Sequence, residues 1–318
     1  MGPRLVFVHG VGKPRDAKRD LDEWRLALAD GMRAAGHSRR ATELLDGRSA
    51  DIRFAYYGDL FPGQGPGARP EQAEEQEEGE LAQLLLDAVD ARLEAPRDDR
   101  EAQVLRRARE QLAPEGEAQG AGDVLRRTLA AGNTLLALPG LRRIGGWTSA
   151  GLMVHVLRQV RQYLARKHPD AAGVSLDARI RDRVRAELDP EGPTPVVAHS
   201  LGTVVAFETL HEHEAAIPLL VTLGSPIGMR AAVQPRMRPQ PLRTPAQVGG
   251  WLNFWDRDDF VTATPRLERF VAPNAASVVP VSRRVDSDGA WVHPAAKYLA
   301  QSAVAGPIAE ALEAVTPV

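Results

Sequence analysis

The sequence predicts an α/β protein in which a doubly wound, mostly parallel sheet is interrupted by one large helical insertion. Short apolar runs typical of buried strands alternate with amphipathic helical patterns, as a sheet covered by helices requires. The chain of 318 residues, 43% of them hydrophobic, is ample for a sizeable core. The strand-like runs are 5–8, 52–56, 195–197, 251–255 and 277–281.

Helical periodicity fills the intervals between these runs. In the first interval we expect an amphipathic helix around Trp24, Leu26, Leu28 and Met32. A further helix is expected over 176–188, directly before the strand at 195–197. The sequence thus predicts that strands alternate with covering helices on both sides of the insertion.

A turn between a strand and a helix carries the most informative residues of the chain. Residues 196–206 read Val-Val-Ala-His-Ser-Leu-Gly-Thr-Val-Val-Ala, so a β-branched run leads into Ser200 and an apolar helical pattern follows it. Such a nucleophile elbow holds the serine in a strained conformation and exposes its hydroxyl at the end of the strand. The residues two before and two after the serine must be small, and here they are Ala198 and Gly202, with His199 completing the turn. We therefore expect Ser200 to be a nucleophile.

A second turn that contains glycine follows the first strand-like run. Residues 9–12 read His-Gly-Val-Gly, and glycines at such a place let the backbone approach a ligand closely. In an acyl-transfer site, backbone N–H groups here can stabilise a developing oxyanion. We expect the donors to be the N–H of Leu201 and the N–H of Val11 or Gly12. The alternative is that these glycines only shape a tight turn.

These two turns resemble those of the α/β-hydrolase-fold serine hydrolases of the lipase and esterase kind. The resemblance covers the predicted core and does not extend to the insertion. It implies an α/β-hydrolase fold, a Ser-His-Asp mechanism and a triad ordered along the chain as serine, acid and histidine. The family pattern is Gly-x-Ser-x-Gly, so Ala198 departs from it by one methyl group. The resemblance implies no particular substrate, because this fold carries many activities.

The triad order places the acid after a strand that follows the nucleophile. The run 251–255 is a suitable strand, and three aspartates, Asp256, Asp258 and Asp259, come directly after it. Family members often carry the acid in an Asp-x-Val context, which Asp259 matches. The sequence does not show which carboxylate turns inward. Asp256 and Asp258 therefore stay open as alternatives to Asp259.

The same order places the catalytic histidine after the last strand. His293 follows the run 277–281 and a turn over 286–289, and it precedes a helical pattern that contains Tyr298 and Leu299. Lipase-like members often have a histidine followed by a Tyr-Leu pair and a terminal amphipathic helix. We therefore expect His293 to be the general base, held by the acid and facing the nucleophile.

The insertion lies between the first strands and the nucleophile elbow. Proline and glycine break regular structure at 62–67, and the acidic, glutamine-rich run 71–80 is typical of a solvated or mobile segment. Helical periodicity then returns in four stretches near 81–93, 104–112, 125–138 and 147–164. We expect residues 1–61 and 171–318 to form the hydrolase core and residues 62–170 to form a helical cap or lid over the site.

Composition excludes several classes of function. The net charge of −2 gives no field that would attract nucleic acid or an anionic membrane. The absence of cysteine excludes disulfides, thiolate metal sites and a cysteine nucleophile. His211 and His213 lack the His-Glu-x-x-His spacing of a metal site, and no phosphate-binding or dinucleotide motif is present. We expect no metal and no cofactor.

The location of the chain is predicted from its ends and its apolar runs. A strand that begins at residue 5 leaves no room for a signal peptide, and no apolar run approaches the length of about 20 residues that a membrane span needs. The expectation is a cytoplasmic protein without a transmembrane segment. The oligomeric state stays open.

The function expected from these residues is cleavage of a carboxylic ester through an acyl-enzyme intermediate. The partner would be a small-molecule ester or another acyl substrate. A thioesterase, an amidase or an acyltransferase would use the same triad. A hydrolase-fold protein that binds a small molecule without catalysis is the alternative from a different class.

Overall fold

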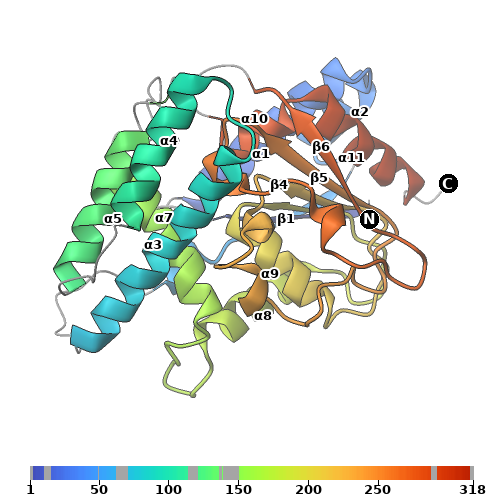
Figure 1. Ribbon diagram of the computed structural model, residues 1–318. Coiled ribbons are helices and arrows are strands. Elements are labelled where there is room, and N and C mark those ends of the chain that lie inside the picture. The colour runs from blue at the N-terminus through green and yellow to red at the C-terminus, as the bar shows by residue number, and fades with distance from the viewer. Residues whose placement is uncertain are drawn as a thin grey trace.

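The computed structural model describes most of the two predicted core segments and most of the insertion. The described residues are 3–10, 16–48, 50–61, 71–113, 121–135, 138, 150–287 and 292–315. Within these ranges a single six-stranded sheet forms the centre of the molecule (Figure 1). Its strands are β1 (Arg4–Val8), β2 (Asp51–Ala55), β3 (Val196–His199), β4 (Leu220–Leu223), β5 (Trp251–Asp256) and β6 (Pro280–Val285).

The strand order is β2-β1-β3-β4-β5-β6, and all five pairings between neighbours are parallel. The chain moves from β1 toward one edge of the sheet and from β3 toward the other, so the order reverses between these two strands. In open parallel sheets, ligands bind at the carboxyl ends of the strands at such a switch point. Val8 and Ala198 pair in register near those ends, directly before the two turns singled out in the sequence.

Helices cover both faces of the sheet because successive side chains of each strand point to opposite faces. Leu5 and Phe7 of β1 pack into one buried cluster, whereas Val6 and Val8 pack into another. The first face carries α1 (Ala17–Ala34), α2 (Ser38–Leu45), α10 (Ala295–Leu299) and α11 (Ser302–Ala314). The second face carries α8 (Leu176–Glu187) and α9 (Leu201–Leu210).

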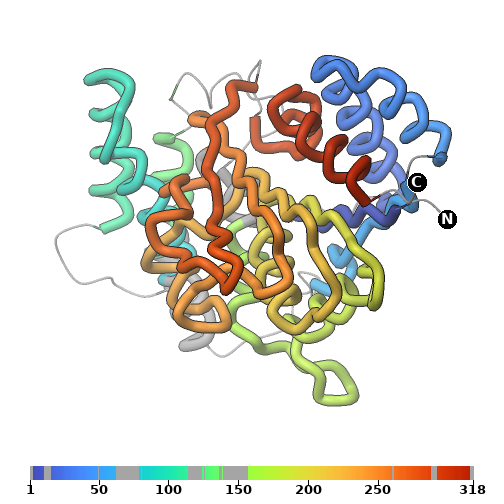
Figure 2. The backbone as a smooth tube through the Cα atoms, turned by 90° about the vertical axis from the view of Figure 1, so that its right-hand side faces the viewer, coloured from blue at the N-terminus to red at the C-terminus, as the bar shows by residue number. Residues whose placement is uncertain are grey.

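The insertion forms a group of mutually packed helices at one side of the sheet (Figures 1 and 2). All of them fall between residues 62 and 170. They are α3 (Glu71–Leu93), α4 (Asp99–Leu112), α5 (Ala121–Leu135) and α7 (Ala150–Leu164). Short 3-10 helices occupy several of the loops, namely η1 (Gly58–Leu60), η2 (Pro226–Gly228), η3 (Gln234–Arg236), η4 (Phe260–Thr262) and η5 (Leu267–Arg269).

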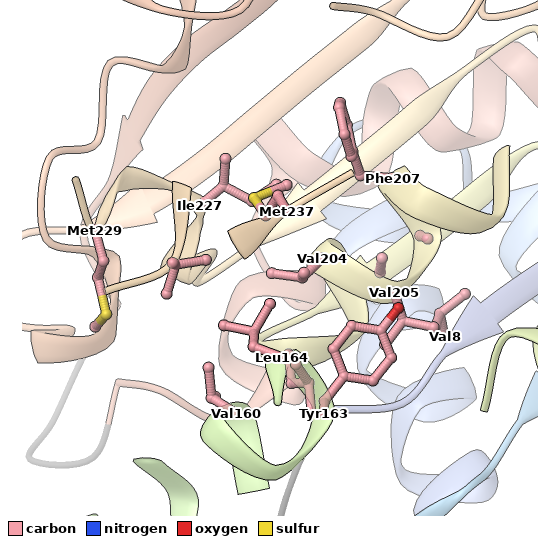
Figure 3. Close-up of a cluster of buried hydrophobic side chains, with 14 of the residues drawn as sticks. Val8, Val160, Tyr163, Leu164, Val204, Val205, Phe207, Ile227, Met229 and Met237 are labelled. Carbon is pink, nitrogen blue, oxygen red and sulfur yellow. The ribbon is translucent and has the colours of Figure 1, made fainter. Parts of the chain in front are cut away.

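The insertion and the sheet share one hydrophobic core. The apolar residues of α3, α5 and α7 belong to the same buried cluster as those of β3 and α9. Figure 3 shows Val160 and Leu164 of α7 in one buried cluster with Val204 of α9 and Ile227 of η2. Because these helices bury their apolar stripes against the core, the insertion is an integral layer of the structure.

Three sequence predictions about elements differ from the structure. The acidic run 71–80 is the first part of α3, and its many Glu and Gln residues are good helix formers. The last strand is Pro280–Val285 and not 277–281, because an edge strand tolerates the polar residues that the apolar criterion rejects. Leu26 is 56% exposed, so the buried stripe of α1 excludes it. The predicted break at 62–67 lies outside the described residues.

Candidate active site

Ser200 lies in the turn between β3 and α9 with an unusual backbone conformation. Its φ of 51° and ψ of −128° fall in a region that residues with a Cβ atom rarely adopt. The turn is fixed by a hydrogen bond from the Ser200 N–H to the carbonyl of Leu223, at 2.9 Å. The side chain is fully buried, and its Oγ lies 3.1 Å from Nε2 of His293.

The small residues on either side of Ser200 have distinct packing reasons. A Cβ atom on Gly202 would lie 2.4 Å from the carbonyl oxygen of His9 and 2.6 Å from that of Val8, so only glycine lets α9 begin this close to the end of β1. Ala198 is fully buried within β3, where it pairs with residues of β1 and β4. The structure accommodates the methyl group of Ala198 at this position.

The turn after β1 approaches the serine closely. A Cβ atom on Gly10 would lie 2.8 Å from Nδ1 of His199 and 2.9 Å from Cβ of Ser200. Of the three expected oxyanion donors, Val11 and Gly12 lie outside the described residues. Leu201 is the first residue of α9, and backbone N–H groups in the first turn of a helix have no partner within the helix.

His293 joins the serine to a buried carboxylate. Its Nδ1 atom lies 2.9 Å from Oδ1 and 2.8 Å from Oδ2 of Asp259, while its Nε2 faces the serine. The carboxylate beside Nδ1 assigns the ring proton to that nitrogen, which leaves Nε2 free to accept from the Ser200 hydroxyl. Serine, histidine and aspartate thus form one continuous chain of hydrogen bonds.

The carboxylate of Asp259 is buried and receives further donors. The Tyr298 hydroxyl donates to Oδ2 at 2.7 Å, and the Val261 N–H donates to Oδ1 at 3.1 Å. Burial raises the pKa of Asp259, but the charge of His293 and the hydrogen bonds from His293, Tyr298 and Val261 together hold that pKa below its ordinary value. A Cβ atom on Gly224, which has a φ of +55°, would lie 2.7 Å from Oδ2. Glycine is therefore required beside the acid.

The other two aspartates of this loop point elsewhere. Asp256 accepts the backbone N–H of Asp258 at 2.8 Å through Oδ1, and its other oxygen accepts the N–H of Ser287 at 2.6 Å. Asp258 faces the insertion, where it pairs with Arg92 at 3.1 Å and also with Arg97. Of the three carboxylates left open by the sequence, only Asp259 contacts His293 among the described residues.

His199, which the sequence predicts as part of the elbow, is buried and makes a contact that was not predicted. Its Nε2 lies 2.7 Å from the backbone carbonyl of His293, and the two imidazole rings are 4.7 Å apart. Burial and the nearby His293 lower the pKa of His199 to about 3, so the ring is neutral and its Nε2–H donates to that carbonyl. This hydrogen bond ties the elbow to the segment that carries the histidine.

Tyr298 is a second residue whose place in the site was missed. The sequence predicts it only as part of the Tyr-Leu pair and the helical pattern that follow His293. Its hydroxyl accepts the N–H of Asp256 at 3.1 Å while it donates to Asp259. The position of this tyrosine, in the first helix after His293, was the available signal.

Metal ligation was not expected from the sequence. Among the residues that the structure describes, no cluster of three His, Cys, Asp or Glu side chains is placed to hold a metal ion. His211 has its Nε2 3.1 Å from the carbonyl of Arg243 and therefore binds the backbone. In the described segments, no helix is both long enough and apolar enough to cross a membrane.

The fold and the site together define a parallel α/β protein with a buried serine–histidine–aspartate chain at the switch point of its sheet. Comparison with models of known protein families, with curated proteins and with solved structures gives no significant match.

Proposed function

We propose that this chain is a serine hydrolase of the α/β-hydrolase fold that cleaves a carboxylic ester through an acyl-enzyme intermediate. The observation that carries the proposal is the hydrogen-bonded chain from Ser200 through His293 to Asp259, with the serine in a strained turn at the sheet's switch point. A serine that served only as a turn residue would need neither the strain nor the two buried partners.

The acylation step follows from this geometry. As the Ser200 oxygen attacks the ester carbonyl, its proton passes to Nε2 of His293, 3.1 Å away. A tetrahedral oxyanion forms, and the N–H of Leu201 together with that of Val11 or Gly12 would stabilise it. The imidazolium then gives its proton to the leaving alkoxide, the ester C–O bond breaks, and the acyl group remains on Ser200.

Deacylation uses the same groups in reverse. His293 accepts a proton from a water molecule that attacks the acyl carbon, and it returns that proton to the Ser200 oxygen as the acid product leaves. Asp259 keeps the Nδ1–H tautomer in place and stabilises the imidazolium in both steps. Although Asp259 is buried, its pKa is lowered, so its carboxylate stays ionised in both steps.

The burial of Ser200 and His293 limits which substrates can reach the site. Ser200 is fully buried and His293 is only 8% exposed among the described residues. A closed site of this kind excludes water from the reacting groups and favours small or slender acyl groups over folded proteins. We therefore propose small carboxylic esters as the substrate class.

A panel of activated substrates tests this proposal. Purified protein is assayed with p-nitrophenyl esters of increasing acyl length, an acyl thioester and an acyl anilide, with Ser200→Ala as the background. The expected result is hydrolysis fastest for short esters and absent in the variant. Preference for the thioester or anilide would replace the ester assignment, and folded protein that turns over none of the panel would contradict the proposal.

A further inference from the structure

The corner between α3 and α4 in the insertion contacts the loop that carries the aspartate of the site. The Arg92 guanidinium donates to the backbone carbonyl of Arg257 and to Oδ1 of Asp258, the latter at 3.1 Å. The same group binds Oε1 of Glu101 through Nε at 2.9 Å and through Nη2 at 2.7 Å. With only 14% of its side chain exposed, Arg92 is a largely buried junction between insertion and loop.

The loop is held from its own side as well. Arg257 donates to the backbone carbonyl of Ala95 at 2.7 Å, and its guanidinium lies 3.6 Å from Glu101. Glu101 is 4% exposed and also accepts the backbone N–H of Arg97. The insertion thus binds the backbone of the loop through Arg92, and the loop binds the backbone of the insertion through Arg257. The buried carboxylate of Glu101 lies beside both guanidinium groups and compensates their charge.

Asp259 directly follows Arg257 and Asp258, the two loop residues that contact the insertion. Between α3 and the loop lies a cavity of about 120 Å³, whose lining includes Arg92, Asp259 and Thr262. The side chains of α3 leave this space open, so packing between α3 and the loop is incomplete beside Asp259. Polar contacts then restrain where the loop sits from this side, and Arg92 makes two of them, to the Arg257 carbonyl and to Asp258.

We propose that Arg92 is a positioning residue, which fixes the loop so that the Asp259 carboxylate stays aligned with Nδ1 of His293. This inference rests on the proposed function, since the alignment matters only if His293 acts as a base. The helical insertion would then supply part of the support for the triad.

Two substitutions separate positioning from stability. Arg92→Lys keeps a positive charge beside Glu101 but loses the planar fork that binds Arg257 and Asp258 together. Arg92→Met removes the charge as well. The matched control is Arg109→Met, because Arg109 of α4 pairs with Asp90 of α3 at 2.8 Å and so joins the same two helices away from the loop.

The readouts are the split between kcat and KM for the best ester and the downfield proton resonance of the His293 Nδ1–H. For Arg92→Lys we expect kcat to fall about tenfold or more with KM nearly unchanged, since small misplacements of catalytic groups have effects of this order. The resonance should shift or broaden in Arg92→Lys and Arg92→Met. Both readouts should be unchanged in Arg109→Met.

Wild-type kcat and an unshifted resonance in a folded Arg92→Lys variant would overturn the proposal. Equal losses in the Arg92 and Arg109 variants would also overturn it, because they would assign the effect to the stability of the insertion. The resonance reports the alignment of His293 and Asp259 without any substrate. A protein that has no esterase activity but loses this signal on Arg92 substitution would refute the proposed function and leave the positioning role standing.

Discussion

Nε2 of His293 lies 3.1 Å from Oγ of Ser200, although 93 residues separate them in the sequence. The serine is placed by the turn between β3 and α9, whereas the histidine belongs to the segment that connects the edge strand β6 to α10. His199, the residue before the serine, holds the histidine's backbone carbonyl at 2.7 Å. The contact between the two side chains is therefore supported by a second contact, from the His199 side chain to the backbone of His293.

Substitution of the three aspartates should separate their roles. Asp259→Asn keeps the shape of the side chain but loses the acceptor that fixes the His293 tautomer, so kcat should fall on the order of 10⁴-fold. Asp256→Asn and Asp258→Asn disturb only backbone caps and the contact with the insertion. Each should stay at least about 100-fold more active than Asp259→Asn, measured as ester turnover. A crippled Asp256→Asn beside an active Asp259→Asn would reject Asp259 as the acid.

Removal of the Tyr298 hydroxyl should affect both turnover and stability. Tyr298→Phe takes a donor from Asp259 and an acceptor from the Asp256 N–H, which should lower the free energy of unfolding by about 1–3 kcal/mol. We expect kcat to fall about tenfold, since Asp259 keeps its contact with His293.

Tyr163→Phe provides the matched control for this substitution. Tyr163 is another fully buried tyrosine, and its hydroxyl donates to Glu208 at 2.7 Å, away from the site. Denaturant unfolding should show a comparable loss of stability, whereas ester turnover should stay at the wild-type value. An equal drop in turnover in both variants would mean that Tyr298 acts only through general stability.

The strained turn at Ser200 should have a measurable free-energy cost. Glycine adopts a φ of 51° and ψ of −128° readily, whereas alanine does not. Ser200→Gly should therefore exceed Ser200→Ala in free energy of unfolding by about 1 kcal/mol, although both are inactive. In the regular strand before the turn, Ala198→Gly should instead destabilise the protein by about 1 kcal/mol. Equal stability of the two Ser200 variants in denaturant unfolding would show that the turn is unstrained.

The buried His199 should make stability depend on pH. Its pKa is about 3 in the folded protein against an ordinary value of 6.5, because it is buried beside His293. Between these two pH values the unfolded chain binds a proton that the folded protein excludes. The free energy of unfolding should therefore fall as the pH falls below 6.5, by up to about 1.4 kcal/mol per pH unit.

His199→Gln removes the titrating group and retains a donor for the His293 carbonyl. Its stability should change less steeply between about pH 5 and pH 7 than that of the wild type, measured by denaturant unfolding at several pH values. The wild-type slope in His199→Gln would show that His199 does not account for the pH dependence.

The elbow could be predicted from the sequence because its requirements are local. A strand, two small residues around a serine and a following helix all lie within 196–206, and the close approach at Gly202 gives the physical reason for one of them. His293 and Asp259 were predicted through the order of the family that the chain resembles. The Asp-x-Val context favoured Asp259, but the sequence could not exclude Asp256 and Asp258, because Arg92 and Ser287 bind these two from distant parts of the chain.

Contacts between distant segments account for what the sequence did not predict. The role of Arg92 depends on how α3 meets the loop after β5, and no pattern within α3 reports that. The insertion was predicted as a helical cap, and its packing partners were not predicted: Tyr163 of α7 donates to the buried Glu208 of α9, and the two helices share a core. Helical periodicity predicts which side of a helix is apolar, but it does not say which partner covers it.

Whether Ser200 is an activated nucleophile can be read from covalent labelling of the purified protein with a fluorophosphonate, followed by mass-spectrometric mapping of the modified peptide. A serine in a plain turn is unreactive, whereas one that His293 deprotonates attacks the phosphorus and displaces fluoride. We predict stoichiometric modification of Ser200, none in Ser200→Ala and strongly slowed modification in His293→Ala. Modification of a different serine, or none in folded wild-type protein, would contradict the assignment of Ser200, His293 and Asp259 as a catalytic triad.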